Sequence, residues 1–241
     1  MGLGGLVFSW IGHSWRLLRV AVTLVRYDVL LPAEYYDRYP TSLQATHTAL
    51  SIFAKRRRGK SVGTRLAKAL ERLGPAYVKV GQFLATRPDM IGVTAAQDLA
   101  RLKDRLPPFS RTIALDTINS ELGGTEELFA GISEAMGAAS IAQVHQAIVP
   151  RHGVVAIKVL RPRIERKMAR EMAALRFLAQ GIEFFSPRSR RLEPVQFIDT
   201  VAAATEREMD LRLEAGAAAE FKEVIRKGTD LARRSMVAIS L

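Results

Sequence analysis

The sequence has no cysteine, which excludes disulfide bonds and thiolate metal sites. Histidine is scarce, with four in 241 residues, so a histidine-rich metal site is not expected. Uncharged apolar runs are short: the run from Leu3 to Gly12 falls well below the roughly 20 residues that span a bilayer. Met1 is followed by glycines and apolar residues instead of a basic start, so no signal peptide is predicted. With 48% hydrophobic and 25% charged residues, the chain suits one or two globular domains with real cores.

Positive charge is abundant and unevenly distributed. Residues 1–75 carry 12 Lys/Arg and 4 Asp/Glu, a net charge of +8 within a total of +12. The run from Lys55 to Lys60 (KRRRGK) is its focus. This pattern favours an anionic partner, either a membrane surface or a nucleic acid, although a solvated linker is the alternative. We expect no nucleic-acid partner, because no stacking-aromatic pattern or recognition motif accompanies the basic residues.

Residues 3–31 form a mostly apolar helical stretch that also carries Arg16, Arg19 and Arg26. At 100° per residue the three arginines fall within an arc of roughly 80°, so they share one face. Trp10 and Trp15 lie in the same stretch. We interpret it as an interfacial helix on an anionic membrane surface. The alternative is an amphipathic helix packed on the protein's own core.

Helical patterns continue to about residue 125. One helix ends at Gly74, and Pro75 begins the next. On that next helix, Lys79 and Gln82 are spaced i and i+3, so they share a face beside the apolar stripe. A further helix is expected over residues 111–122.

Residues 137–160 (GAASIAQVHQAIVPRHGVVAIKVL) predict a strand pair. Two strand-like runs, 143–149 and 154–160, flank a turn, which favours an antiparallel pair with Lys158 in its second strand. Residues 155–158 spell V-A-I-K, which in protein kinases presents a lysine to nucleotide phosphates and a helix glutamate. The alternative is an ordinary hairpin with one exposed lysine.

The loop before these strands contains Gly137, Ala138, Ala139 and Ser140. A protein kinase has G-x-G-x-x-G there. Backbone amides of the loop could still point at a phosphate, but Cβ atoms on three of the four residues limit how closely it approaches.

Two long helices are predicted after the strands, over residues 161–185 and 194–227. The second carries Glu208, Asp210 and Glu214. Because Asp210 and Glu214 are spaced i and i+4, we expect them on one helical face. A solvated acidic face is the alternative. The chain closes on the strand-like segment SMVAISL.

Four motifs in order resemble the UbiB family of atypical, protein-kinase-like proteins. Residues 79–82 (KVGQ), within LGPAYVKVGQFLATRPDM, resemble the K-x-G-Q motif of its leading helix. AASIAQVH resembles its alanine-rich nucleotide loop, and VAIKVLRP resembles its third strand. EREMDLRLEA, with Glu208 and Asp210, resembles its E-x-D motif. The resemblance covers roughly residues 25–225.

The resemblance implies an α+β fold: a helical amino-terminal extension followed by a kinase-like N-lobe, with the C-lobe absent. We expect three segments: a basic, membrane-proximal one over 1–60, the extension with K-x-G-Q over 61–125, and the truncated N-lobe over 126–241. It further implies ATP or ADP with Mg²⁺ as the ligand. It also implies support of ubiquinone (coenzyme Q) biosynthesis at the cytoplasmic side of a bacterial inner membrane, with ubiquinone-pathway proteins or lipid intermediates as partners. The family's older label, 2-polyprenylphenol 6-hydroxylase, has no counterpart in flavin or iron motifs here.

Residue roles carry over by motif. Ala138, Ala139 and Ser140 would cover the phosphates, and Lys158 would contact them. Glu208 or Glu214 would pair with Lys158, with Asp210 beside them on the metal side. The regulatory extension would place residues 79–82, with Lys79, Gly81 and Gln82 as its motif residues, over the nucleotide site.

The sequence also departs from the family. No H-R-D-like or D-F-G sequence follows Glu214, so no catalytic residue is assigned and a truncated or fragmentary member is expected. Two functions remain open: an ATP-binding atypical kinase or ATPase, and a non-catalytic, membrane-associated binding or scaffold protein of the ubiquinone pathway.

Overall fold

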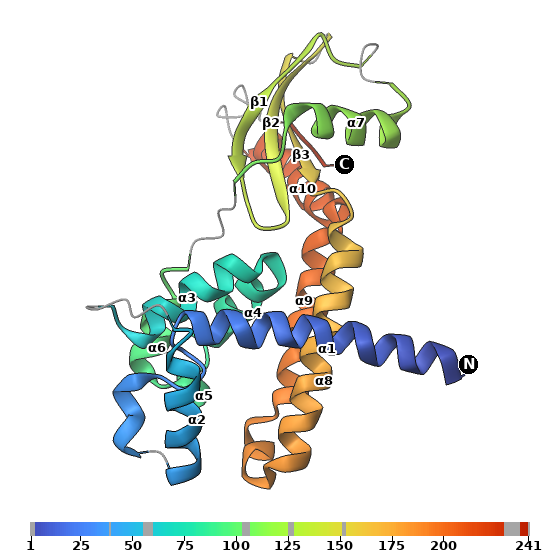
Figure 1. The fold of residues 1–241 in the computed structure, drawn as a ribbon. Helices are drawn as coiled ribbons and strands as arrows, with labels where there is room; N and C mark the ends of the chain where they lie inside the picture. Colours follow the sequence, from blue (N-terminus) through green and yellow to red (C-terminus); the bar gives the residue numbers. More distant parts are fainter. Residues whose placement is uncertain are drawn as a thin grey trace. The chain divides into compact units, whose positions relative to one another are not determined.

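The computed structural model describes residues 3–38, 40–54, 60–102, 107–124, 128–150, 153–228 and 237–240 (Figure 1). The chain forms two compact units, each assembled from two separate stretches. Unit 1 contains residues 1–103 and 167–203, and unit 2 contains residues 104–166 and 204–241. The α+β fold class is confirmed, since a helical extension precedes a small sheet.

Unit 1 is helical. Its elements are α1 (Leu3–Arg26), η1 (Ala33–Arg38), α2 (Thr41–Ser51), α3 (Val62–Leu73), α4 (Pro75–Ala85), α5 (Pro88–Ile91), α6 (Val93–Leu99), most of α8 (Ile164–Phe185), η2 (Pro187–Leu192) and the first part of α9 (Pro194–Met209). Ser61 caps α3 by accepting a hydrogen bond from the Thr64 N–H at 3.2 Å. The predicted break between α3 and α4 falls at Gly74, whose φ of 115° suits glycine.

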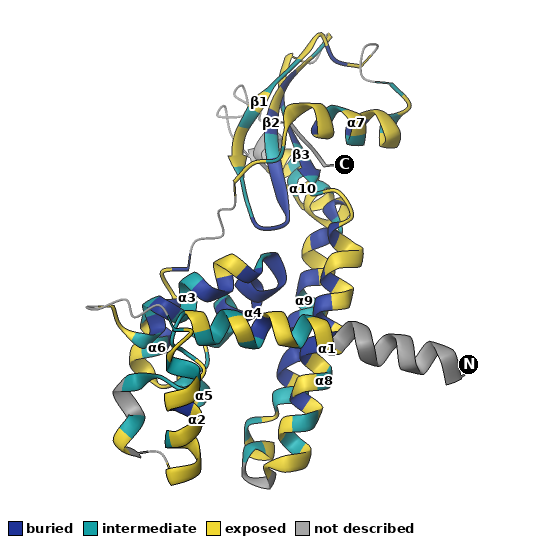
Figure 2. Ribbon diagram, viewed as in Figure 1, coloured by how far each residue is buried: buried dark blue, intermediate teal, exposed yellow. Residues whose placement is uncertain are grey.

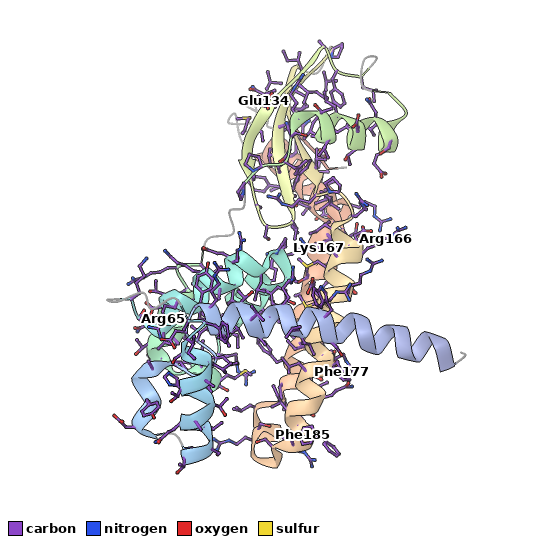
Figure 3. The ribbon with its side chains drawn as sticks, in the orientation of Figure 1. Arg65, Glu134, Arg166, Lys167, Phe177 and Phe185 are labelled. Atoms are coloured by element: carbon purple, nitrogen blue, oxygen red, sulfur yellow. The ribbon has the colours of Figure 1, made fainter. Side chains whose placement is uncertain are left out.

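The core of unit 1 lies around α4. Every residue from Pro75 to Gly81 is buried, as Figure 2 shows for this helix. The α4 helix packs on α3 and α6, while α1 contributes the buried Val20. Arg65 of α3, which Figure 3 labels, donates to the backbone carbonyls of Lys60 and Asp28 at 3.0 and 2.9 Å. These bonds fasten the segment after α1 to the start of α3.

Unit 2 is built on a four-stranded sheet in the order β1-β2-β3-β4, with β1 (Gly131–Ala138), β2 (Ala142–Val149), β3 (Gly153–Leu160) and β4 (Val237–Ser240). The first three strands are antiparallel, and β4 joins β3 in parallel. The α7 helix (Arg111–Leu122) covers one face, where Ile118 packs with Val155, Ile157 and Val159. The α10 helix (Leu211–Gly228) belongs to the same unit and contacts β4.

The strand predictions hold with one addition. Lys158 lies in the second strand of an antiparallel pair, opposite Val144. The strand-like carboxy-terminal segment forms β4. Strand β1 was not predicted, because Ser133 and Glu134 interrupt its apolar pattern and register shifts interrupt its pairing with β2.

One helix prediction needs correction. The helix expected over residues 194–227 breaks at Asp210 into α9 and α10. Asp210 itself is not helical, and its side chain accepts the Arg212 N–H at 3.2 Å at the start of α10. The predicted segments 1–60, 61–125 and 126–241 also differ from the observed units, because residues 167–203 follow the strands in sequence yet pack in unit 1. Within the described residues, no helix is long and apolar enough to cross a membrane.

Candidate nucleotide site

Lys158 and Glu214 form an ion pair between β3 and α10. Alternation along β3 turns Val155, Ile157 and Val159 toward α7, which leaves Lys158 on the opposite face. The first turn of α10 brings Glu214 to that face. The Lys158 side chain is 28% exposed and that of Glu214 56%. Of the two carboxylates that the sequence left open, Glu214 is the one that contacts the lysine.

Asp210 bonds Arg212 instead of Lys158. Its carboxylate accepts two hydrogen bonds from the Arg212 guanidinium, at 2.8 and 2.9 Å. The hydrogen bond from Arg212 is the main reason why the pKa of Asp210 is lowered. The expectation that Asp210 and Glu214 share one face of a continuous helix is wrong, because the helix breaks at Asp210. Glu208 lies in the last turn of α9.

The alanine-rich loop connects β1 to β2. Ala138 ends β1, and the Ala139 N–H bonds the Ala142 carbonyl at 2.7 Å across the turn. Ala138 and Ala139 are half-buried, whereas Ser140 is wholly buried. The Ser140 side chain therefore packs inside unit 2, and Ala138 and Ala139 are the side chains of the motif that reach the surface.

Arg161 fixes this loop through hydrogen bonds to its backbone, a role that the sequence analysis did not assign. Its guanidinium donates to the Ala139 carbonyl at 2.9 Å and to the Pro107 carbonyl at 3.0 Å. Its Cζ lies 5.7 Å from the centre of the Phe109 ring. The backbone N–H of Arg161 also bonds the Ile141 carbonyl at 2.8 Å. The signal in the sequence was the position of Arg161 directly after the V-A-I-K strand.

A buried polar network lies on the α7 side of the sheet. The Gln143 Oε1 accepts from the Phe109 N–H at 3.0 Å, which fixes the amide orientation and makes Nε2 a donor. That Nε2 lies 2.8 Å from His145 Nε2, so this ring nitrogen must accept. The proton is then on Nδ1, which donates to the Ser133 carbonyl at 2.9 Å. Sequence analysis missed this network, although both residues lie in AASIAQVH.

The K-x-G-Q residues lie on α4 in unit 1. Lys79 is buried and Gln82 is half-buried. A Cβ on Gly81 would lie 2.6 Å from Leu70 Cδ1 and 2.9 Å from Leu102 Cδ1. The glycine of the motif thus permits close packing of α4 within its own unit. That Lys79 and Gln82 face the alanine-rich loop stays a prediction.

The α4 helix also carries a buried hydroxyl–carboxylate contact. The Tyr77 hydroxyl donates to Glu171 Oε2 of α8 at 2.5 Å. Arg19 of α1 donates to the other carboxylate oxygen at 3.0 Å, and its Cζ lies 6.0 Å from the centre of the Tyr77 ring. Burial, followed by the hydrogen bond to Glu171, raises the pKa of Tyr77. Three helices of unit 1 are joined at this point.

The described residues fit a phosphate group better than they fit a metal ion. Lys158 supplies a cation held in place by Glu214, beside a loop fixed by Arg161, and these features fit a phosphate group. Among the residues that the structure describes, no cluster of three His, Asp or Glu side chains could hold a metal ion.

Comparison with known proteins identifies relatives of this chain. The family model of the ABC1 atypical kinase-like domain matches residues 101–232. A protein of Marinobacter nauticus named "Probable protein kinase UbiB" is 36% identical over 86% of this chain and 38% of its own length. Its namesakes from Shewanella loihica and Aeromonas hydrophila are each 35% identical, over 83% and 86% of this chain and 37% and 38% of their own lengths.

The β3 lysine, its α10 glutamate partner and the alanine-rich loop define a kinase-like N-lobe. The chain belongs to the ABC1 atypical kinase-like family. It spans a little over a third of the length of these relatives, at 38% of the Marinobacter protein.

Proposed function

We propose that this chain binds ATP or ADP as the nucleotide-binding part of a UbiB-type atypical kinase that supports ubiquinone biosynthesis. The observation that carries the proposal is the Lys158–Glu214 pair, since protein kinases pair a strand lysine with a helix glutamate where that lysine contacts nucleotide phosphates. Ala138 and Ala139 would lie over the phosphates, with Arg161 fixing the loop. The names of the relatives support the kinase class.

Mg²⁺ would enter with the nucleotide instead of occupying a prepared site. Nucleotide phosphates supply part of the coordination of Mg²⁺ in kinase sites, and carboxylates supply the rest. Asp210 is the nearest motif carboxylate in sequence to Glu214, but it would have to leave Arg212 to bind a metal. We therefore expect nucleotide binding to depend less on Mg²⁺ here than in a kinase with a complete metal site.

The test is nucleotide binding by the whole chain. Calorimetry and thermal unfolding in the presence of ATP or ADP measure this binding. Lys158→Ala should weaken binding at least about tenfold, because a charge-assisted hydrogen bond contributes roughly 1.5–3 kcal/mol. Lys222→Ala is the matched control, since Lys222 is an exposed lysine on α10 in the same unit. Equal affinities for the wild type and Lys158→Ala would contradict the proposal.

A membrane surface is the second proposed partner. On α1, the apolar side chains of Trp15, Leu18 and Val22 are 71%, 53% and 57% exposed. They lie on one side of the helix with Arg26, while Val20 is buried on the other. The helix thus combines packing on its own unit with an exposed apolar face, which is the pattern of an interfacial helix.

Substitution tests this better than deletion, because removing α1 would also remove the buried Val20 and the Arg19–Glu171 ion pair. The triple variant Trp15→Ser, Leu18→Ser, Val22→Ser should reduce flotation with vesicles that contain phosphatidylglycerol. Unchanged flotation would reject α1 as a membrane-binding element. In that case lipid binding through α1 could not support the scaffold function that the sequence left open.

A further inference from the structure

The turn between α8 and α9 presents two phenylalanines to solvent. Phe184 is 73% exposed and Phe185 is 83% exposed. Their rings form a T-shaped pair with centroids 5.0 Å apart and an interplanar angle of 89°. Figure 3 labels Phe185 where α8 ends, away from the α4 core of the same unit. Ile182, one turn earlier on the helix, is 41% exposed and extends the apolar surface.

Hydrogen bonds order this turn, so the exposure of the two rings belongs to a defined conformation. Arg190 Nε donates to the Glu183 carbonyl at 2.9 Å, and the Glu183 carboxylate accepts the Val195 N–H at 3.1 Å. Ser189 Oγ donates to the Ser186 carbonyl at 2.6 Å. Farther along, Arg176 of α8 and Asp199 of α9 form an ion pair at 2.7 Å. These bonds fix the backbone of the turn that follows the two rings.

Positive charge follows the exposed rings in the same turn of the chain. Arg190 and Arg191 of η2 are both exposed, and they follow Phe185 by five and six residues. Of the two acidic residues nearby in the sequence, Glu183 is engaged with the backbone of α9, and Glu193 follows Arg191 by two residues. Exposed aromatic rings with arginines at the same end of a helical hairpin are complementary to a bilayer interface, where apolar chains lie beneath anionic headgroups.

We propose that the α8–α9 turn, comprising Phe184, Phe185, Arg190 and Arg191, inserts into the interfacial layer of an anionic phospholipid bilayer. The rings would enter between the lipids, and the arginines would contact phosphate groups. A protein partner fits this feature less well, because a stable interface needs roughly 800 Å² on each side and two rings at the end of a hairpin offer far less. The proposal deepens the membrane contact proposed for α1 and adds a second, separate element to it.

The absence of cysteine allows a direct test with the full chain. The Phe185→Cys variant is labelled with a polarity-sensitive fluorophore. Its emission maximum should shift to shorter wavelength when phosphatidylglycerol-containing vesicles are added. Phe221→Cys is the control, because Phe221 is 66% exposed on α10 and also has basic residues near it in the sequence (Lys222, Arg226 and Lys227), but it lacks a second phenylalanine beside it. A label that reports water equally at both positions in the presence of these vesicles overturns the proposal.

Flotation provides the second measurement. Phe184→Ser with Phe185→Ser should lower the vesicle-bound fraction at least about tenfold, since transfer of two large apolar side chains is lost. Phe221→Ser should bind as the wild type does, and Arg191→Gln should weaken binding only at low salt. Loss of binding in the α1 triple variant alone would overturn the role of the turn and leave the α1 proposal intact. Equal binding to vesicles of phosphatidylcholine alone would overturn the role assigned to the arginines.

Discussion

At the scale of single residues, Lys158 shows how a short motif acquires meaning. The V-A-I-K sequence fits either a hairpin with an exposed lysine or a phosphate-binding strand. The contact with Glu214 selects between two candidate carboxylates that sequence spacing treated equally. Because the helix breaks at Asp210, α10 begins directly after it and has Glu214 in its first turn. Asp210 itself contacts Arg212. That break was not visible in the 3.6-residue periodicity.

The Lys158–Glu214 pair should matter for ligand binding far more than for folding. Both side chains are partly exposed, and ion pairs of this kind contribute roughly 0–1 kcal/mol to stability. We expect Lys158→Met to leave the free energy of unfolding within about 1 kcal/mol of wild type. The same variant should lose the rise in melting temperature that ATP or ADP produces. Urea unfolding and nucleotide-dependent thermal shifts measure the two effects separately, and a large loss of stability without nucleotide would contradict the first expectation.

The Tyr77–Glu171 contact predicts a pH-dependent contribution to stability. Tyr77→Phe leaves the buried Glu171 carboxylate without one donor, which should cost about 1–3 kcal/mol. The pKa of Tyr77 is higher in the folded state than in the unfolded state, where it is near 10. The contribution is therefore fully present below about pH 10 and is lost as the pH rises above it.

The measurement compares the wild type with Tyr77→Phe by urea unfolding at about pH 8 and about pH 11. The difference in free energy between them should shrink at the higher pH. Because the other tyrosines and the lysines titrate in both proteins, the difference isolates Tyr77. A difference that stays constant over this range would show that the Tyr77 hydroxyl is not coupled to folding.

At the scale of elements, the packing of α3 on α6 depends on a glycine. A Cβ on Gly63 would lie 2.6 Å from Asp98 Cβ and 3.0 Å from Ala95 Cα. Since Ala95 Cα is backbone, the helices must separate to admit a methyl group. Separation would also disturb the Ser61–Asp98 hydrogen bond of 2.5 Å. We expect Gly63→Ala to lower the free energy of unfolding by about 1–3 kcal/mol, despite the better helix propensity of alanine.

Gly216→Ala on α10 is the matched control for Gly63→Ala. A Cβ there meets open space, so only the helix propensity changes, and stability should rise by up to about 1 kcal/mol. Chemical unfolding of the two variants gives both values. Opposite signs support close packing at α3–α6, whereas equal stabilisation in both variants would rule it out.

The elements show what the sequence could and could not predict. Turn residues and apolar periodicity predicted the α3–α4 break at Gly74, the α7 helix and the antiparallel β2–β3 pair. Strand β1 was not predicted, because its polar residues and register shifts obscure the two-residue alternation of apolar and polar side chains that is typical of a strand. The network of Gln143 and His145 also escaped, since its partners Phe109 and Ser133 are distant in sequence. Local patterns identify elements, whereas these contacts arise only from tertiary packing.

At the scale of the whole molecule, the chain passes from unit 1 to unit 2 and back before it returns to unit 2. The α8–α9 hairpin separates β3 from α10 in sequence, so Lys158 and Glu214 lie 56 residues apart yet form a pair. The predicted division into consecutive segments at residues 60 and 125 could not include this return of the chain to unit 1. No change in composition marks either end of the hairpin. The hairpin and the K-x-G-Q helix α4 share unit 1 through Tyr77 and Glu171.

The final prediction concerns catalysis by the 241-residue chain as a whole. Phosphoryl transfer relies on positioning and on metal ions that neutralise developing charge, with one aspartate at the acceptor and another at the metal. Asp210 is held by Arg212, so its carboxylate would have to leave that guanidinium to bind a metal ion. Lys158 and the loop beside it could bind phosphates without completing this set.

We therefore expect the purified 241-residue chain to bind nucleotide without hydrolysing ATP or transferring its phosphate above background. The measurement is phosphate release from ATP with Mg²⁺, at equal concentrations of wild type, Lys158→Ala and Lys222→Ala. All three should give the same background rate, while calorimetry separates the first variant from the other two proteins by affinity. Turnover in the wild type and Lys222→Ala that disappears in Lys158→Ala would mean that carboxylates elsewhere in the chain complete the site. Glu208 and Asp210 would then be the first to replace by their amides, because they lie in the motif that precedes α10.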